Sequence, residues 1–168
     1  MKRRLFLKAG SAMLASSTFP ASLHADSTPQ GSTIMKIHKT KEEWRKTLSS
    51  EAFDVLRNHG TERAFSSPLN QEKREGTYLC AGCELPLFHS SAKFDSGTGW
   101  PSFFTAIREH IETQRDFSMI FPRTEYHCIR CHGHQGHLFK DGPQPTGERW
   151  CNNGVALHFV PTQPDATT

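Results

Sequence analysis

The sequence predicts a mainly β domain of antiparallel strands, with short N-terminal helices and a site made of paired cysteines. From residue 61 onward helical periodicity is absent, and Gly, Pro, Ser and Thr separate short apolar segments. The loops between these segments are too short for helical crossovers, which favours antiparallel pairing. Two C-x-x-C units add the third observation, since each can form a knuckle that presents two thiolates.

Six short apolar segments are the expected strands, and no helical repeat runs through them. They are "GTYLC", "PLFHS", "FSMIFP", "YHCIRC", "HLF" and "VALHFVP".

Two short helices are expected before the β region. Residues Thr40 to Glu43 have the S/T-x-x-E form of a capping box, which predicts a helix through about Leu48. A second helix is predicted in "SSEAFDVLRNHG", where Ser49 is the N-cap. Gly60 is expected to supply the left-handed position after this helix. The two helices look like a brace for another part of the chain.

The first 25 residues do not resemble part of a domain. A basic start that contains Lys2, Arg3, Arg4 and Lys8 precedes a weakly apolar stretch and a small-residue cleavage site, which is typical of a signal peptide. We expect residues 1–25 to be that signal, 26–33 a flexible linker, 34–161 the domain and 162–168 a tail. The apolar stretch is too short and interrupted for a membrane anchor.

The signal has a recognisable subtype. "RRLFLK" at residues 3 to 8 resembles the bacterial twin-arginine export motif, with Lys2 where Ser or Thr is usual. The resemblance implies export in the folded state and a periplasmic location.

Charge excludes two classes of partner. Of the 20 basic residues four lie in the signal, so the mature part has 16 basic against 17 acidic residues and a net charge of about −1. No Lys/Arg run remains to bind nucleic acid or anionic lipid. We expect no nucleic acid and no stable membrane insertion. Gly97-Thr98-Gly99 lacks the Lys and helix context of a phosphate loop, so no nucleotide is implied.

Four of the five cysteines form two pairs, which are Cys80 with Cys83 and Cys128 with Cys131. Two such knuckles make a tetrahedral site for one structural Zn²⁺, and Gly82 gives the first turn its freedom. Disulfides are an alternative, although a C-x-x-C bridge closes a strained loop. Cys128 to His132 also matches a c-type haem attachment pattern, and a thioredoxin-like redox pair would require a βαβ context.

The fifth cysteine, Cys151, stands alone in "GERWCNNGVALHF". It is either a buried Cys that packs as a small apolar residue or a nucleophile assisted by Arg149 and a histidine. Sequence composition alone leaves both open.

Several motifs together resemble the B-type methionine sulfoxide reductases, which reduce methionine-R-sulfoxide. They are "DSGTGWPSF" (95 to 103), "GHQGHLF" (133 to 139), "DGPQPTGERWC" (141 to 151) and the two C-x-x-C units, in the family's order. The resemblance covers residues 34 to 161. It implies a fold of two antiparallel β-sheets.

The resemblance also implies residue roles. Cys151 matches the nucleophile that attacks the sulfoxide sulfur as a thiolate. His134 and His137 match the pair that orders water or a proton donor, and Trp100 matches the aromatic wall against the substrate methyl. Asn153 matches a supporting polar residue, while Asp141 and Arg149 fit places behind these groups.

Each of these residues has a simpler alternative. The two histidines could be solvated loop residues. Trp100 could belong to the core. Asn153-Gly154 is also a hairpin-turn signal, in which case Asn153 would serve the backbone.

The chain departs from the family at three positions. Attack on the sulfoxide leaves Cys151 as a sulfenic acid, and many relatives carry a second cysteine that reacts with it. Thr98 stands at that position here, so an external thiol is expected to reduce the sulfenic acid. Trp150 replaces the usual Tyr or Phe, and His132 stands where Asp or Gly is common.

The expected partners are therefore oxidised proteins that carry methionine-R-sulfoxide and a reductant, either a thioredoxin-fold protein or a small thiol. A monomer is expected. The rival hypothesis is a non-catalytic zinc-ribbon binding module, which would require the paired cysteines but neither Cys151 nor His137.

Overall fold

The structure is a computed structural model that describes residues 34–163. Two short helices come first, α1 (Lys41–Thr47) and α2 (Ser50–Asn58). Thr40 forms the predicted capping box with Glu43, because each side chain binds a backbone N–H at the helix start. Ser49 caps α2 as predicted, by accepting from the Ala52 N–H. The predicted signal peptide and linker lie outside the described residues.

One detail of α2 differs from the prediction. The left-handed residue at its C-terminus is His59, with φ 58°, and not Gly60. A histidine adopts this conformation because its side chain gains partners there. Its Nδ1 lies 2.9 Å from Glu125 Oε1, and its ring lies 5.2 Å from that of His134.

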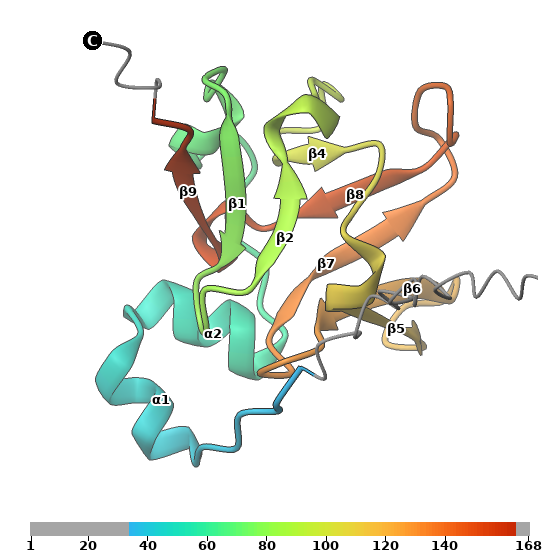
Figure 1. Ribbon diagram of the computed structural model, residues 1–168. Coiled ribbons are helices and arrows are strands. Elements are labelled where there is room, and N and C mark those ends of the chain that lie inside the picture. The colour runs from blue at the N-terminus through green and yellow to red at the C-terminus, as the bar shows by residue number, and fades with distance from the viewer. Residues whose placement is uncertain (1–33, 164–168) are drawn as a thin grey trace, which may run out of the picture. The chain divides into compact units, whose positions relative to one another are not determined.

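Two antiparallel sheets form the body of the domain, as predicted (Figure 1). The smaller sheet has the order β2-β1-β9, and the larger has the order β3-β4-β8-β7-β6-β5. The strands are β1 (Gly76–Cys80), β2 (Pro86–His89), β3 (Lys93–Phe94), β4 (Ser102–Phe103), β5 (Ile111–Asp116), β6 (Arg123–Cys128), β7 (His134–Phe139), β8 (Arg149–Asn152) and β9 (Leu157–Pro161). Short 3₁₀ turns lie at Pro68–Asn70, Ser90–Ala92, Arg108–His110 and Gly154–Ala156.

The prediction of a strand at "FSMIFP" is wrong. Residues 117–122 form the loop between β5 and β6, and the strands are the polar segments on either side of it. In β5 and β6 the pairing continues to the last pair, Asp116 with Arg123, where the side chains form an ion pair. Apolar composition predicted a strand here, but the apolar side chains have no sheet face to pack against.

An aromatic core holds the two sheets together. Tyr78 and Phe88 come from the smaller sheet and Phe103, Tyr126 and Trp150 from the larger, and all five are buried. Phe88 stacks on Phe103 at 4.1 Å, and Tyr126 meets Trp150 edge to face at 5.0 Å. Such pairs add to the stabilisation that apolar burial gives. Trp150 thus belongs to the core, where its Nε1 donates to Glu148.

Arg57 of α2 adds polar contacts to the buried apolar packing between the helices and the rest of the domain. Its guanidinium lies over the Trp44 ring at 4.0 Å. It also donates to the backbone oxygen and the sulfur of Cys131, at 2.7 and 3.3 Å. The helices therefore brace the cysteine cluster, a part of the domain that the sequence did not single out for this role. Within the described residues, no helix is both long enough and apolar enough to cross a membrane.

Candidate active site and cysteine cluster

Cys151 lies in β8, between two neighbouring strands of the larger sheet. It is opposite Ser102 of β4 on one side and His137 of β7 on the other. Successive residues of a strand point to opposite faces, so Trp150 enters the core while Cys151 faces a pocket. The pocket measures about 130 Å³ and is lined by Thr61, Trp100, Arg123, Gly136, His137, Phe139, Cys151, Asn152 and Asn153.

A larger depression of about 580 Å³ lies between α2 and residues 61–68. Its lining includes no cysteine or histidine among the described residues. The smaller pocket is the candidate site, because it holds both a nucleophile and an imidazole.

Burial raises the pKa of the half-buried Cys151 thiol above its ordinary value. The positive charge of Arg149 and hydrogen bonds from Thr98 and Ser102 act in the opposite direction. The free thiol is thus more protonated than an exposed cysteine, and its thiolate depends on these three neighbours.

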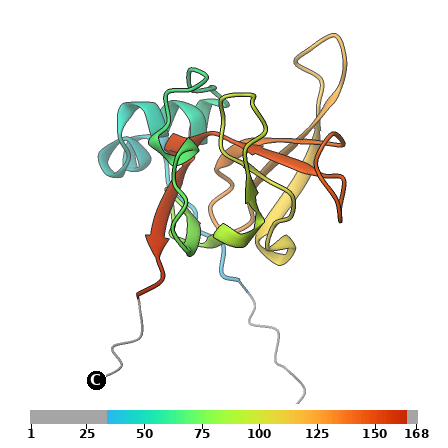
Figure 2. The ribbon, with the colours of Figure 1, turned by 90° about the horizontal axis from the view of Figure 1, so that it is seen from above.

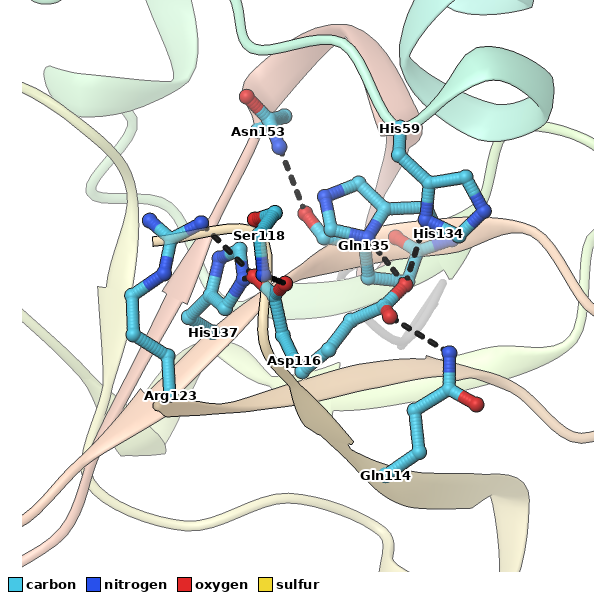
Figure 3. A network of polar contacts seen from close by, with 10 residues as sticks. His59, Gln114, Asp116, Ser118, Arg123, His134, Gln135, His137 and Asn153 are labelled. Atoms are coloured by element: carbon cyan, nitrogen blue, oxygen red, sulfur yellow. Dashed lines mark hydrogen bonds and ion pairs between the residues drawn. The ribbon is translucent and has the colours of Figure 1, made fainter. Parts of the chain in front are cut away.

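His137 faces the pocket from β7 and is held from behind by an acid. Its Nε2 donates to Asp116 Oδ2 at 2.8 Å, and Arg123 donates to the same oxygen at 2.8 Å (Figure 3). Burial lowers the His137 pKa, against the hydrogen bond to Asp116 that raises it. The ring is therefore fixed in orientation and mostly neutral at neutral pH.

His134 is buried behind His137, with the two ring centroids 5.5 Å apart. Its Nδ1 lies 2.6 Å from Glu125 Oε1. Burial raises the pKa of Glu125, but donors from Gln114 and His134 outweigh it and hold that pKa below its ordinary value. His134 does not line the pocket.

A bulge in β7 explains why His134 and His137 share one face. Residues three apart on a regular strand point to opposite faces. Here Tyr126 is opposite Gly136 while His127 is opposite His134, so Gln135 is an extra residue. The backbone carbonyl oxygen of Gln135 instead accepts hydrogen bonds from the backbone N–H and the side-chain amide of Asn153, at 2.9 and 3.0 Å.

Glu62 is a residue that sequence reasoning missed. Its carbonyl accepts from Trp100 Nε1 at 3.1 Å, and its N–H donates to Asn153 Oδ1 at 3.0 Å. Its carboxylate accepts from the N–H groups of Gly154 and Val155, at 2.5 and 3.0 Å. One residue thus positions both Trp100 and Asn153 at the pocket. Nothing in the local pattern around Glu62 signals this.

The hairpin turn that Asn153-Gly154 offered as an alternative does not form, because a 3₁₀ turn follows Asn153. The Asn153 amide does serve the backbone, through Glu62 and Gln135, while also lining the pocket. Trp100 is half-buried and lines the pocket instead of the core.

Arg149 and Asp141 form a two-bond ion pair, with both N···O distances at 2.9 Å. The guanidinium also lies over the Phe139 ring at 4.2 Å. The pair therefore orients the positive charge that acts on Cys151. Neither residue lines the pocket itself.

The four paired cysteines meet at the ends of β1 and β6, and all five cysteines of the chain are free. The sulfurs of Cys80 and Cys131 are 3.6 Å apart and those of Cys83 and Cys128 3.5 Å. A tetrahedral zinc with ~2.3 Å bonds would hold its sulfurs ~3.8 Å apart, so the cluster fits this ion. Disulfides and haem attachment do not fit this arrangement, since all four sulfurs converge on one centre.

Gln135 links the cluster to the pocket. Its side-chain Nε2 donates to the Cys80 sulfur at 3.3 Å, and its backbone carbonyl accepts a hydrogen bond from the Asn153 amide. His132, by contrast, is exposed near Glu112 and does not line the pocket.

Fold and site together define a cysteine-dependent enzyme with an imidazole beside its nucleophile and a four-cysteine cluster typical of a zinc site. Comparison with known proteins identifies its family. The SelR domain model matches residues 48–161, and the chain belongs to this family.

Relatives from distant organisms carry the same name, "Peptide methionine sulfoxide reductase MsrB". That of Pseudomonas putida (strain W619) is 54% identical over 130 residues, which are 76% of this chain and 97% of the relative. That of Bradyrhizobium diazoefficiens is 50% identical over 127 residues, 75% and 91% of the two chains. That of Methanosarcina barkeri is 48% identical over 124 residues, 73% and 87%. The chain is thus a peptide methionine sulfoxide reductase of the MsrB type, and the hypothesis of a non-catalytic module is wrong.

Proposed function

We propose that this enzyme reduces methionine-R-sulfoxide in proteins through Cys151. The observation that carries the proposal is the pairing of Cys151 with His137 on adjacent strands, in one pocket beside Trp100. The thiolate attacks the sulfoxide sulfur, and the S–O bond breaks as the oxygen passes to the Cys151 sulfur. Methionine leaves, and Cys151 becomes a sulfenic acid. Sulfur of the substrate is reduced by two electrons and that of Cys151 is oxidised by two.

His137 orders a water or another proton donor near the sulfoxide oxygen, because the reaction requires a proton there. The sulfoxide oxygen is a poor leaving group until it is protonated, and an imidazole in the pocket can hold or order that proton. Asp116 keeps the ring in place, and His134 packs behind it with Glu125. Trp100 offers an apolar face to the substrate methyl, while Asn153 maintains the loop after the nucleophile.

An external thiol completes the cycle. Thr98 stands where many relatives carry the second cysteine, and its side chain favours the Cys151 thiolate by lowering the thiol pKa. The other four cysteines are held in the cluster. An incoming thiol attacks the sulfenic acid, water leaves, and a second thiol releases Cys151 from the mixed disulfide.

Mass spectrometry after one turnover without reductant tests this step. We expect one oxygen added to Cys151. An intramolecular disulfide that includes Cys151 contradicts an external thiol.

We further propose that the cluster of Cys80, Cys83, Cys128 and Cys131 holds one structural Zn²⁺. When bound, the ion supplies folding free energy and keeps its thiolates from oxidation. Arg57 and Gln135 donate to two of its sulfurs, as expected of groups that balance thiolate charge.

The decisive test of activity is Cys151→Ser. The variant should lose all reduction of an R-sulfoxide peptide with dithiothreitol as reductant, because serine forms no comparable nucleophile. Its zinc content should be unchanged, since Cys151 lies outside the cluster. Separated R and S epimers of N-acetyl-methionine sulfoxide provide the stereochemical control: only R should be reduced. Activity retained in the variant refutes the assignment of the nucleophile.

Export by the twin-arginine route to the periplasm completes the proposal, on the strength of "RRLFLK" alone. Cell fractionation should recover a shortened protein in the periplasm. Arg3→Lys together with Arg4→Lys should leave the full-length protein in the cytoplasm; periplasmic recovery of that variant argues against this route.

A further inference from the structure

The loop between β5 and β6 exposes an unusual amount of apolar surface. Phe117 is 73% exposed, Met119 58%, Ile120 93% and Phe121 81%, and these four residues are called the apolar tip below. Figure 2 shows the hairpin that carries it extending away from the rest of the domain. Most soluble proteins keep such side chains apart from one another, and a contiguous group of them marks an interaction surface.

The apolar tip is continuous with the active site. Asp116 and Arg123 begin and end the loop, and they are joined by an ion pair of 2.8 Å. Asp116 holds His137, and Arg123 lines the pocket that contains Cys151. Figure 3 shows Asp116, Ser118 and Arg123 around His137. The first turn of the loop is fixed too, because the Ser118 N–H donates to Asp116 Oδ1 at 2.9 Å. The surface therefore starts at the rim of the pocket.

The chemistry of the surface selects its occupant. Residues 117–122 carry no charge, and the Asp116–Arg123 pair at their base is neutral. A charged partner gains nothing from such a surface. A second copy of this chain is also a poor fit, since stable interfaces use about 20–30 residues a side and the loop has six.

We propose that the apolar tip binds apolar residues that flank a methionine sulfoxide in an unfolded polypeptide. This inference rests on the proposed function and extends it to substrate choice. Methionine is mostly a core residue, so a methionine sulfoxide and the apolar residues near it in sequence become accessible chiefly when a protein unfolds. A pocket of about 130 Å³ has room for the sulfoxide side chain alone. The flanking chain must therefore lie outside the pocket, against its rim.

A small buried apolar area is enough to produce a measurable preference. Burial of about 55 Å² of apolar surface gives roughly a tenfold change in affinity, at about 25 cal/mol per Å² and 1.4 kcal/mol per factor of ten. One phenyl ring of the apolar tip offers this much contact. We therefore expect roughly a tenfold preference for a substrate with apolar flanks.

Three substrates test the proposal. Two are peptides with one central methionine-R-sulfoxide, flanked on both sides by Leu and Val in one and by Ser and Gln in the other. The third is N-acetyl-methionine-R-sulfoxide, which has no flanks. The variant is Phe117→Ser, Ile120→Ser and Phe121→Ser combined. The control variant is Met35→Ser with Val160→Ser, which removes exposed apolar residues that do not line the pocket.

The wild type and the control should reduce the apolar peptide with a kcat/KM roughly tenfold above that of the polar peptide. The triple variant should lose this preference and keep its kcat/KM on the blocked amino acid within about twofold. Equal kcat/KM values for both peptides in the wild type overturn the inference, as does a preference that survives in the triple variant. Co-sedimentation of the wild type but not the triple variant with phosphatidylcholine vesicles, without peptide preference, also overturns it and assigns the surface to a membrane. Failure of the wild type on all three substrates refutes the proposed function instead.

Discussion

At the scale of single residues, the state of Cys151 depends on a balance between burial and nearby charge. Burial raises the thiol pKa, while Arg149, Thr98 and Ser102 lower it. Burial wins, so the thiolate is the minor form of the free enzyme at neutral pH. The enzyme therefore relies on few neighbours to generate its nucleophile, and Arg149 is the only positive charge among them.

We predict that alkylation of Cys151 by iodoacetamide speeds up with rising pH, with a midpoint above the ordinary thiol pKa. Arg149→Met should move the midpoint higher, because the charge that favours the thiolate is gone. Peptide mass spectrometry measures the alkylation of Cys151 separately from that of the cluster cysteines.

Asp141→Asn is the matched control, since it removes the partner of Arg149 but keeps the charge. Its midpoint should stay the same or fall. A wild-type midpoint below the ordinary thiol pKa would contradict the balance described for Cys151.

The residues behind the histidines were not predictable one at a time. His134 and His137 stand out in "GHQGHLF", but Asp116 and Glu125 lie on other strands and have no sequence signal near them. Two aligned strands place each carboxylate within hydrogen-bond distance of its imidazole. Trp150, which differs from its usual counterparts, proved to be a core residue because strand alternation directs it away from the pocket.

At the scale of elements, the close pairing of β7 and β8 positions Cys151 against His137. Gly136 stands opposite Asn152, and a Cβ built there would lie 1.9 Å from the Cys151 carbonyl oxygen. No side chain can occupy this position unless β8 moves away. Glycine here is required by the approach of two backbones.

We predict that Gly136→Ala lowers kcat/KM by at least tenfold and the free energy of unfolding by about 1–3 kcal/mol, as overpacking does. Peptide reduction and urea unfolding measure the two effects.

Gly147→Asn, in the loop that connects β7 to β8, is the control. Gly147 has φ 68° and open space around its Cβ position, and Asn tolerates this conformation. Its activity should match the wild type. Full activity in Gly136→Ala would mean that β8 can shift without consequence for Cys151.

The β5–β6 hairpin shows where pattern reading fails. "FSMIFP" has strand-forming composition, yet the polar residues on both sides form the ladder and the apolar ones form the loop. Apolar composition indicates that a segment can form a strand packed against an apolar surface. Only the arrangement of the sheet decides whether an apolar surface lies next to that segment. The left-handed His59 is a similar case, since its contact with Glu125 offsets the advantage of glycine.

At the scale of the whole molecule, the cysteine cluster joins the parts on which the pocket depends. It connects strands from both sheets, receives Arg57 from α2, and reaches the loop after Cys151 through Gln135. Metal binding of this kind contributes about 10–16 kcal/mol in small zinc domains, as much as the whole stability of a typical protein.

We predict that Cys80→Ser loses the metal and is strongly destabilised, with a melting temperature at least 15 °C lower than the wild type. Metal analysis and circular dichroism measure the two quantities. Cys151→Ser is the matched control, because it removes a thiol but should keep both metal and melting temperature. A Cys80→Ser variant that melts with the wild type would show that the fold does not depend on the cluster.

The sequence by itself determined the features that spacing along the chain encodes. These are the paired cysteines, the lone Cys151, the helix caps and the antiparallel β class, and each follows from chain geometry over a few residues. Only the tertiary structure decided which residues support the site: Asp116, Glu125, Glu62 and Gln135. Their contacts run between strands and loops far apart in sequence, and a single bulge at Gln135 changes which side chains share a face. Register and bulges arise from packing of the whole domain, so no local pattern contains them.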